Sequence, residues 1–219
     1  MKKFPISFSR VSTFESCPTK FEYLYVTKQV VDQGNQYTLH GTRVHEALEH
    51  YGKGTISVLP DDMTKYTGMM DKILAREGIK HFEYQMAIDA EKNPCDWFAD
   101  SVWIRGVADV LIIDGEKAWC LDHKTGQVKD NPTQLQLFAA LVFAHFPDVQ
   151  IVNTSYLWLA HGTVTKSEYT RGMVGHIWTS LTPRFDAVQE AYDLGVFEPK
   201  PSRLCRWCPA KDICGSAQR

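Results

Sequence analysis

Apolar residues recur at helical spacing through the first third of the chain. Residues 10–26 form an amphipathic run in which Pro18 suits the first turn of a new helix, so we expect two short helices that meet near Cys17. Residues 41–51 repeat apolar positions every three or four residues, and residues 61–76 form a further helical segment behind a proline. The N-terminal part of the chain is therefore expected to be helical.

The middle of the chain changes to a pattern typical of strands. Three segments are rich in Val, Ile and aromatic side chains, and turn-forming residues separate them: 81–89, 102–113 and 117–123. Asp114-Gly115 between the last two segments is typical of a tight hairpin, which would make those two strands antiparallel neighbours.

Helical and strand patterns alternate in the rest of the chain. Residues 133–146 predict a long apolar helix, and residues 150–160 and 163–170 predict a second hairpin. Residues 172–194 predict a last helix, which Pro183 is expected to kink or break. This order of elements predicts an α/β fold in which helices flank a central mixed sheet.

Length and charge narrow the class of protein only in part. A chain of 219 residues fits a single domain, which we divide into a helical part (about 1–80), a core (about 81–170) and a C-terminal helix with a Cys-rich tail (about 171–219). It has no apolar stretch near the roughly 20 residues of a membrane span and no apolar run behind its first lysines, so we expect a cytoplasmic protein. The net charge of -2 neither indicates nor excludes a nucleic-acid partner.

Two aspartates and a lysine fall on the strands of the first predicted hairpin. Side chains alternate between the two faces of a strand, so Asp122 and Lys124 share a face and His123 points away. The hairpin would bring Asp109 close to them from the neighbouring strand. Two carboxylates suit a hard cation such as Mg²⁺, and a nearby lysine can orient or deprotonate a water that attacks a phosphate. The alternative is a surface ion pair between Asp122 and Lys124, worth at most about 1 kcal/mol.

The six cysteines are unevenly placed, because Cys205, Cys208 and Cys214 crowd the C-terminus. In a reducing compartment this grouping predicts metal or cluster chemistry instead of disulfides. A fourth thiolate must come from a distant part of the chain, and Cys17 is the candidate. Four thiolates can hold either zinc or an iron–sulfur cluster.

Seven short motifs follow one another along nearly the whole chain. They are Ser7-x-Ser9, Cys17-Pro18, Gly41-Thr42-x2-His45-x3-Glu49, Gly106-x2-Asp109, Asp122-x-Lys124-Thr125-Gly126, Gln134-Leu135-x2-Phe138-Ala139 and Cys205-x2-Cys208-x5-Cys214. Each motif is weak alone, but the ordered set resembles the RecB-like branch of the PD-(D/E)XK nuclease superfamily. It is most similar to the four-cysteine group, which includes the CRISPR-associated adaptation exonuclease and the AddB nuclease domain.

The resemblance implies a restriction-endonuclease-like core that binds Mg²⁺ or Mn²⁺. The side chains of His45, Asp109 and Asp122 would ligate this metal, with the backbone carbonyl of His123 as a further ligand. The resemblance also implies that the N- and C-terminal segments are joined at a 4Fe–4S cluster held by four thiolates: Cys17, Cys205, Cys208 and Cys214. Zn²⁺ is the alternative occupant of that thiolate site.

Three further residues receive roles from the resemblance. Lys124 would be the catalytic lysine and Gln134 a group that positions DNA or the metal ligands, while Glu83 is an additional acidic candidate. The sequence departs from the family at Phe138, where a tyrosine is frequent. The lost hydroxyl removes a hydrogen bond but no metal ligand.

These residues predict a metal-dependent DNA exonuclease that acts on single strands or free ends. Its partners would be DNA and a separate helicase, recombination or integration protein, in a bacterial cytoplasm and with a phage gene as one source. The alternatives are a DNA-end-binding adaptor with little or no catalysis and a zinc-stabilised adaptor without catalysis. The sequence does not indicate cleavage polarity or oligomeric state.

Overall fold

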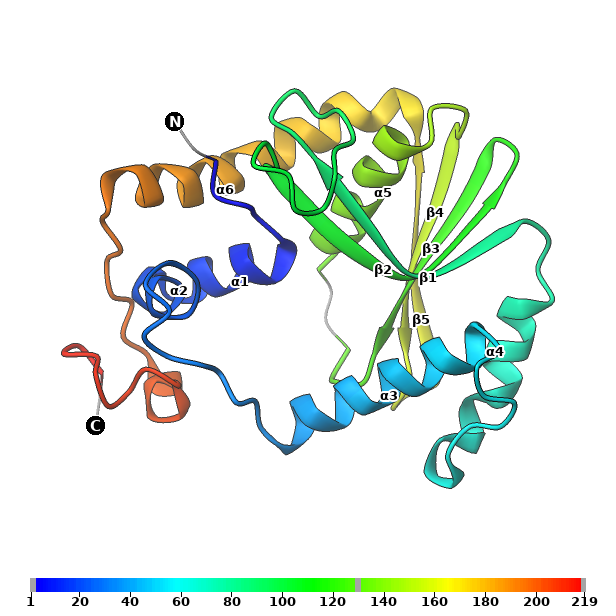
Figure 1. Cartoon of the computed structure of the whole chain (residues 1–219), viewed down its shortest axis with the longest axis horizontal. Helices are drawn as coiled ribbons and strands as arrows, with labels where there is room; N and C mark the ends of the chain where they lie inside the picture. The colour runs from blue at the N-terminus through cyan, green and yellow to red at the C-terminus, as the bar shows by residue number, and fades with distance from the viewer. Residues whose placement is uncertain (1–2, 129–130, 218–219) are drawn as a thin grey trace.

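A mixed five-stranded sheet lies at the centre of the computed structural model, which describes residues 3–128 and 131–217 (Figure 1). The strands lie side by side in chain order: β1 (Ile79–Ile88), β2 (Ile104–Asp114), β3 (Lys117–Lys124), β4 (Ile151–Trp158) and β5 (Thr163–Thr170). Neighbouring strands are antiparallel except β3 and β4, which run parallel. The expectation of a central mixed sheet in an α/β fold is confirmed.

Six α-helices accompany this sheet in the described part of the chain. They are α1 (Phe8–Ser16), α2 (Pro18–Phe21), α3 (Gln36–Gly52), α4 (Thr67–Leu74), α5 (Thr133–His145) and α6 (Val174–Leu194). Shorter helical turns supplement them: a π-helical turn at Glu22–Val26 and 3₁₀ turns at Asp61–Tyr66, Arg171–Met173 and Arg203–Trp207. The first two helices meet at Cys17, as the sequence predicts.

The bounds of three helices differ from the sequence-based expectation. Helix α3 begins earlier than residue 41, because the side chain of Asn35 accepts hydrogen bonds from the backbone N–H groups of Tyr37 and Thr38. The helix expected over residues 61–76 is a 3₁₀ turn followed by α4. Helix α6 passes through Pro183 without a break, since the neighbouring Leu181 and Phe185 are both buried in the core.

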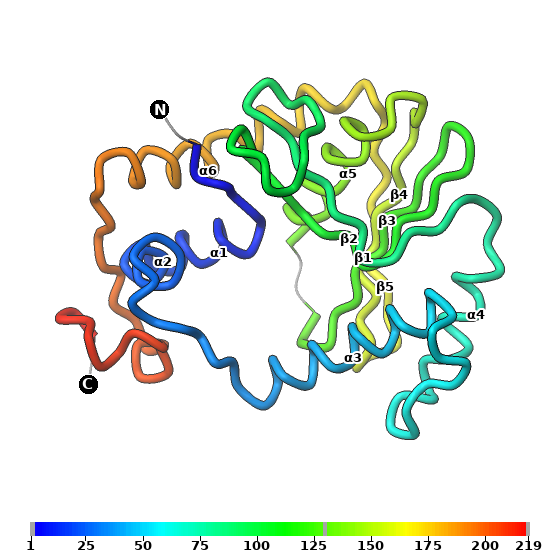
Figure 2. The backbone as a smooth tube through the Cα atoms, viewed as in Figure 1, coloured from blue at the N-terminus to red at the C-terminus, as the bar shows by residue number. Residues whose placement is uncertain are grey.

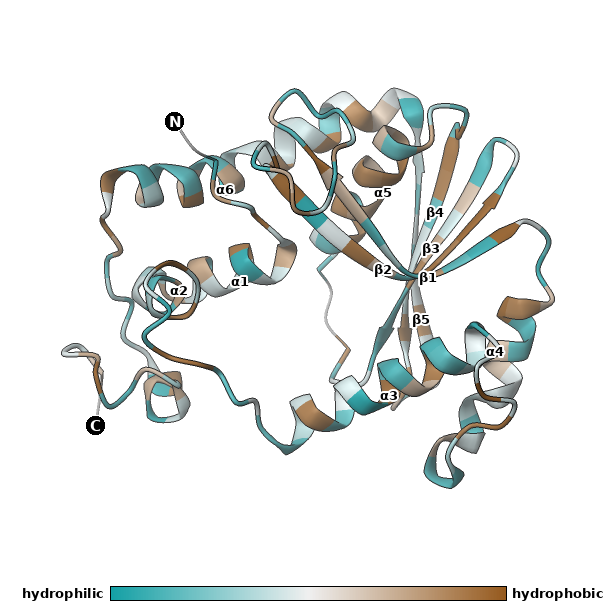
Figure 3. Ribbon diagram, viewed as in Figure 1, coloured by the Kyte–Doolittle hydropathy of each residue, from teal (hydrophilic) through white to brown (hydrophobic). Residues whose placement is uncertain are grey.

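The sheet separates two layers of helices and two apolar clusters. One cluster packs α5 and α6 against one face and includes Ala108 and Cys120. The other packs α3 and α4 against the opposite face and includes Val110 and Ile112. Figure 3 shows that α5 and the strands beside it carry mostly hydrophobic residues. Because α5 connects the parallel strands β3 and β4, its N-terminal end lies close to the C-terminal end of β3.

The first and last segments of the chain lie on the same side of the molecule (Figure 2). The Phe4 N–H donates to the side chain of Gln189 at 3.0 Å, and the Thr19 hydroxyl donates to the Phe197 carbonyl at 2.7 Å. Arg184 forms a two-pronged ion pair with Glu15. These contacts place α1 and α2 against α6 and the C-terminal tail.

Among the described residues, no helix combines the length and the apolar character that crossing a membrane would require.

Candidate active site

The C-terminal end of β3 carries a triangle of polar side chains. Lys124 Nζ lies 2.6 Å from Asp122 Oδ2 in a close ion pair that lacks the geometry of a hydrogen bond. Gln134, in the first turn of α5, accepts a hydrogen bond from Lys124 at 2.9 Å and donates one to Asp122 Oδ1 at 3.0 Å. Asp122 and Lys124 therefore share a face of the strand, and the amide of Gln134 fixes both.

Asp109 lies on the neighbouring strand β2 and is almost completely buried. Backbone pairing between β2 and β3 runs as far as Val110 and Leu121. Beyond that pair, the backbone N–H of His123 donates to the carboxylate of Asp109 at 2.6 Å. The carboxylate is thereby fixed on β3 at a position next to Asp122.

Two histidines converge on Asp109 from α3 and from β3. His45 Nδ1 lies 3.3 Å from Asp109 Oδ1, and His123 Nδ1 lies 3.5 Å from Asp109 Oδ2. Each of the three residues offers a ligand atom within 4.8 Å of the other two. Within residues 3–128 and 131–217 this is the one group of three such ligands found so close together.

The geometry brings most of the expected metal ligands together and adds one. His45 and Asp109 belong to the group just described. Asp122 lies outside that group, but its carboxylate interacts electrostatically with Asp109 and His45. The imidazole of His123 joins the group, although the sequence pattern suggested only its backbone carbonyl as a ligand. That carbonyl role stays a prediction.

Burial and mutual repulsion separate the pKa values of the two aspartates. Burial, with the charge of Asp109, raises the pKa of Asp122 to about 6, and Lys124 offsets part of this effect. Burial also acts to raise the pKa of Asp109, but the hydrogen bond and charge of His45 more than compensate and leave it lowered. A divalent cation would offset the cost of keeping both carboxylates ionised at this place.

The buried ring of His123 also indicates a cation-binding site, in addition to the two aspartates. Burial lowers the pKa of His123 to about 4, so the ring is neutral near pH 7 and one nitrogen carries a lone pair. Both ring nitrogens are buried without a hydrogen-bond partner. A buried polar atom without a partner is costly, and a metal ion bound between His123, Asp109 and His45 would provide one.

Glu83 faces Asp109 from β1 and has an unusual backbone. The strand register pairs Phe82 with Val110 and Tyr84 with Ala108, which leaves Glu83 opposite Asp109. Residues two apart on a strand normally share a face, yet Phe82 packs on the α3–α4 side and Tyr84 on the α5–α6 side. Glu83 has a φ of +51°, a left-handed conformation that costs a non-glycine residue roughly 1–2 kcal/mol. This conformation reverses the alternation of β1 next to the site.

Glu83→Gln should stabilise the metal-free protein at alkaline pH. Burial, with the charges of Asp109 and Glu49, raises the pKa of Glu83 to about 7. The folded state therefore holds a proton that the unfolded chain releases, and stability falls as pH rises from about 4.5 to about 7. In the presence of EDTA, the Tm of Glu83→Gln should exceed that of the wild type at about pH 8 and match it at about pH 4.5. An equal gain at both pH values would contradict this electrostatic explanation.

Two hollows border the candidate site on opposite sides. The first, here called the α3-side hollow, has a volume of about 450 Å³ and is lined by His45, Glu49 and Glu83. The second, the α1-side hollow, has a volume of about 640 Å³ and includes Lys124 and Gln134 in its wall. A larger hollow of about 740 Å³ lies between α4 and β3–β5, but none of the proposed catalytic side chains lines it.

The structure also supplies a residue that the sequence pattern did not single out. Tyr156, on β4, lies beside Asp122 in the parallel register, and its ring centroid is 5.1 Å from Lys124 Nζ. Its hydroxyl donates to the Asn131 carbonyl at 3.1 Å. The ring therefore limits where the lysine can move. Only the register of the parallel strands, which no local motif encodes, could have indicated this contact.

The four clustered cysteines line one hollow between the chain ends. Cys17, Cys205, Cys208 and Cys214 all border a cavity of about 220 Å³. Cys17 Sγ accepts from the Lys200 N–H at 3.4 Å. Cys205 Sγ accepts from the Ser202 N–H at 3.3 Å. Thiolates near N–H donors and basic side chains are typical of metal-cluster sites.

The remaining two cysteines lie elsewhere. Cys120 is fully buried in the sheet, and burial raises the pKa of its thiol. Cys95 lies in the loop between β1 and β2.

Comparison with known protein families identifies the superfamily of the chain. The model of the PD-(D/E)XK nuclease superfamily matches residues 5–215. The chain therefore belongs to the PD-(D/E)XK nuclease superfamily, whose members use divalent metals. No curated protein matches the sequence at a significant level.

Two solved structures that align with nearly the whole chain share little sequence with it. A structure described as "Putative exonuclease" from Eubacterium rectale is 13% identical, with a TM-score of 0.54, and the match covers 97% of this chain and 90% of that one. A structure of a protein designated SSO0001 is 15% identical, with a TM-score of 0.47, and the match covers 100% of this chain and 89% of that one. At these identities the first likeness concerns the fold alone.

Proposed function

We propose that this protein is a divalent-metal-dependent DNA exonuclease that acts on single strands or free ends. The observation that supports it best is the position of one lysine. Lys124 pairs with Asp122, whose carboxylate interacts by charge with Asp109 and His45, and it also lines the α1-side hollow. Metal ligands and a cationic side chain at one accessible place are the groups that phosphodiester hydrolysis requires.

Each side chain has a part in the proposed reaction. His45, Asp109 and Asp122, with His123 through its backbone carbonyl or its ring, would hold Mg²⁺ or Mn²⁺. The ion would lower the pKa of a bound water and offset charge on the phosphate. Lys124 orients the attacking water through an ammonium N–H, and its ion pair with Asp122 fixes where the ammonium lies. Gln134 holds Asp122 and Lys124 at their separation through its two hydrogen bonds. Glu83 is a further acidic group on the metal side of the site.

The cysteine cavity is proposed to hold a 4Fe–4S cluster. Four thiolates about 2.3 Å from one tetrahedral zinc ion would lie about 3.8 Å from one another. Among the described residues no three cysteine sulfurs approach to within 4.8 Å of one another, although all four cysteines line the same cavity. The wider spacing favours a larger occupant than a single Zn²⁺ ion. The cluster would join the N-terminal segment to the C-terminal tail.

The cellular setting of the protein is also a proposal. Its partner is DNA, and a separate helicase, recombination or integration protein would supply substrate ends. We place it in the bacterial cytoplasm, with a phage gene as one source.

Circular DNA provides the test of this proposal. Linear end-labelled single- and double-stranded DNA should be degraded with Mg²⁺ or Mn²⁺ and should survive with EDTA, while closed circular single strands should resist because they have no ends. Cutting of circles at the rate of linear strands would indicate an endonuclease instead. Tight DNA binding without cleavage in either metal would favour the end-binding adaptor and overturn the enzymatic assignment.

A further inference from the structure

The α1-side hollow is built where the N-terminal segment joins the sheet. Ile6 forms a parallel bridge with Ile104, and two backbone hydrogen bonds support it, from Ile6 to Trp103 and from Arg105 to Ile6. This bridge sets the start of α1 against β2. The wall of the hollow thereby combines residues of α1 with Arg105 and with Lys124 of the candidate site.

Two guanidinium groups enter this hollow, those of Arg10 and Arg105. Arg10 stacks between the rings of Phe4 and Tyr25, at 5.1 and 5.2 Å from their centroids, and donates one hydrogen bond to the Pro5 carbonyl. Burial, with the charge of Arg105, lowers the pKa of Arg10. The two positive charges are therefore close enough to repel each other.

Neither arginine forms an ion pair with a carboxylate in the described part of the chain. Arg43 and Arg184, by contrast, form two-pronged pairs with Asp62 and Glu15. A guanidinium has five N–H donors, and Arg10 and Arg105 each use one in a hydrogen bond between described residues. Two neighbouring cations with unused donors are suited to an anion, and no carboxylate among the described residues pairs with them.

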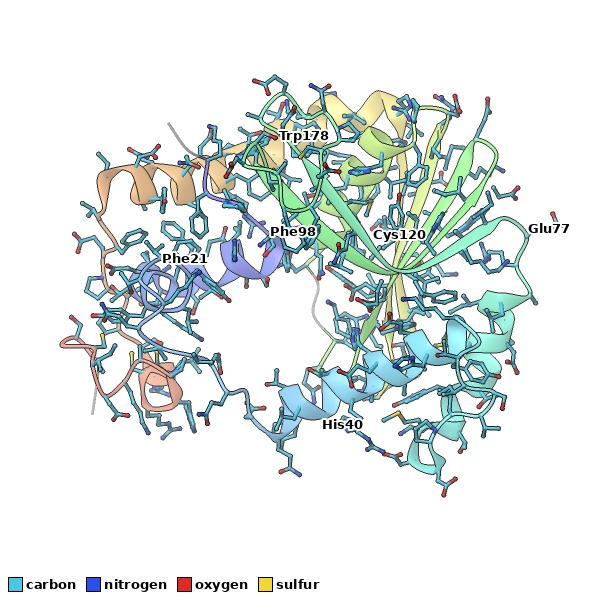
Figure 4. The ribbon with its side chains drawn as sticks, viewed as in Figure 1. Phe21, His40, Glu77, Phe98, Cys120 and Trp178 are labelled. Carbon is cyan, nitrogen blue, oxygen red and sulfur yellow. The ribbon has the colours of Figure 1, made fainter. Side chains whose placement is uncertain are left out.

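Aromatic side chains adjoin these arginines on the loop between β1 and β2. Arg105 lies over the ring of Trp97, with its guanidinium 4.9 Å from the ring centroid. The next residue, Phe98, is 88% exposed, and Figure 4 labels it on this loop. Exposed aromatic rings of this kind can stack on unpaired bases, which is one way in which proteins bind single strands.

We propose that the α1-side hollow is a subsite for single-stranded DNA next to the cleaved bond. Arg10 and Arg105 hold a backbone phosphate adjacent to the one at Lys124, and an unpaired base stacks on Phe98. The hydroxyls of Ser7 and Ser9, which hydrogen-bond to each other at 3.0 Å, border the same hollow and can donate to this phosphate. This inference rests on the proposed nuclease function, because it takes the DNA strand to run past Lys124.

The subsite is tested by DNA binding in a variant that cannot cleave. A fluorescent oligothymidylate is titrated with Lys124→Ala protein, at several salt concentrations, with and without Arg10→Gln and Arg105→Gln. Because the two arginines hold one phosphate, their loss should lower the magnitude of the slope of log K against log salt by about 0.7, the contribution of one neutralised phosphate on a single strand. Phe98→Ala should weaken binding about tenfold without changing this slope, whereas Phe98→Trp should retain it.

A charge-matched control comes from the hollow between α4 and β5. Lys72→Gln with Lys166→Gln removes two positive charges from residues that line that hollow. This pair should leave the slope unchanged. An equal effect of the control pair and the arginine pair would overturn the proposal, because general attraction would then explain both.

Chemical neutralisation of the DNA tests the phosphate contact in protein that keeps both arginines. A methylphosphonate is placed at each linkage in turn, and binding to Lys124→Ala protein is measured. One linkage next to the cleaved bond should weaken binding when neutralised, and Arg105→Gln protein should lose that sensitivity. Uniform sensitivity at all linkages would overturn the subsite. Cleavage by the wild type is measured separately, so a missing nuclease activity is distinguishable from a missing subsite.

Discussion

Lys124→Ala is expected to reduce metal-dependent DNA cleavage by about a thousandfold. A correctly placed proton-transfer group contributes roughly 10²–10⁴-fold, and the ammonium of Lys124 is held within 2.6 Å of Asp122 and 2.9 Å of Gln134. The fold should survive, because the side chain of Lys124 is partly exposed. Single-turnover degradation of end-labelled DNA in Mn²⁺ measures the effect, and circular dichroism verifies the fold.

Lys117→Ala is the matched control for this variant. Lys117 lies on the same strand, is exposed, and lines neither of the hollows that border the site. Its activity should equal that of the wild type. Asp122→Asn should be as inactive as Lys124→Ala, since the amide cannot provide an anionic ligand. Activity within threefold of wild type in Lys124→Ala would exclude this lysine from the chemistry.

Cys17→Ser is expected to have the largest effect on stability. If Cys17 and the C-terminal cysteines hold one cluster, the cross-link closes a loop of nearly the whole chain, which the chain-entropy treatment values at roughly 5 kcal/mol. The corresponding loss in Tm is about 10–20 °C for a protein of this size. Thermal unfolding of anaerobically purified protein measures the loss, and iron, sulfide and visible absorbance measure the cluster.

Cys95→Ser provides the comparison, because Cys95 does not line the cysteine cavity. This variant should keep both the wild-type Tm and the metal content. A colourless wild-type protein with stoichiometric zinc would contradict the iron–sulfur assignment. A Cys17→Ser protein that retains full iron and the wild-type Tm would show that Cys17 is not a ligand.

The hairpin that carries the candidate site could be predicted from the sequence, because it depends on local residues. Asp114 pairs with Lys117 across a two-residue turn, and Gly115 has the positive φ that such a turn needs. From there, the alternation of side chains along β3 places Asp122 and Lys124 on one face. Both the turn and the alternation depend on residues that are close together in the chain, so they can be predicted from one sequence.

Other features depend on contacts between distant segments and could not be predicted. The reversal of β1 at Glu83 breaks the alternation on which strand prediction relies. The ring of His123 was expected to point away from Asp122 and does so, yet it meets His45 only because α3 covers that face. The partners of Arg10 and Arg105 likewise depend on the bridge between Ile6 and Ile104.

The contacts between the chain ends also impose an order on folding. Synthesis proceeds from the N-terminus, so α1 and α2 leave the ribosome first, but their partners on α6 and the tail leave last. The sheet and α3 can assemble the His45–Asp109–His123 group before α6 exists. The wall that α1 gives to the hollow beside Lys124 is secured only when synthesis is nearly complete. Under the proposed roles of these two places, a nascent chain would complete its metal ligands before the wall of its DNA subsite.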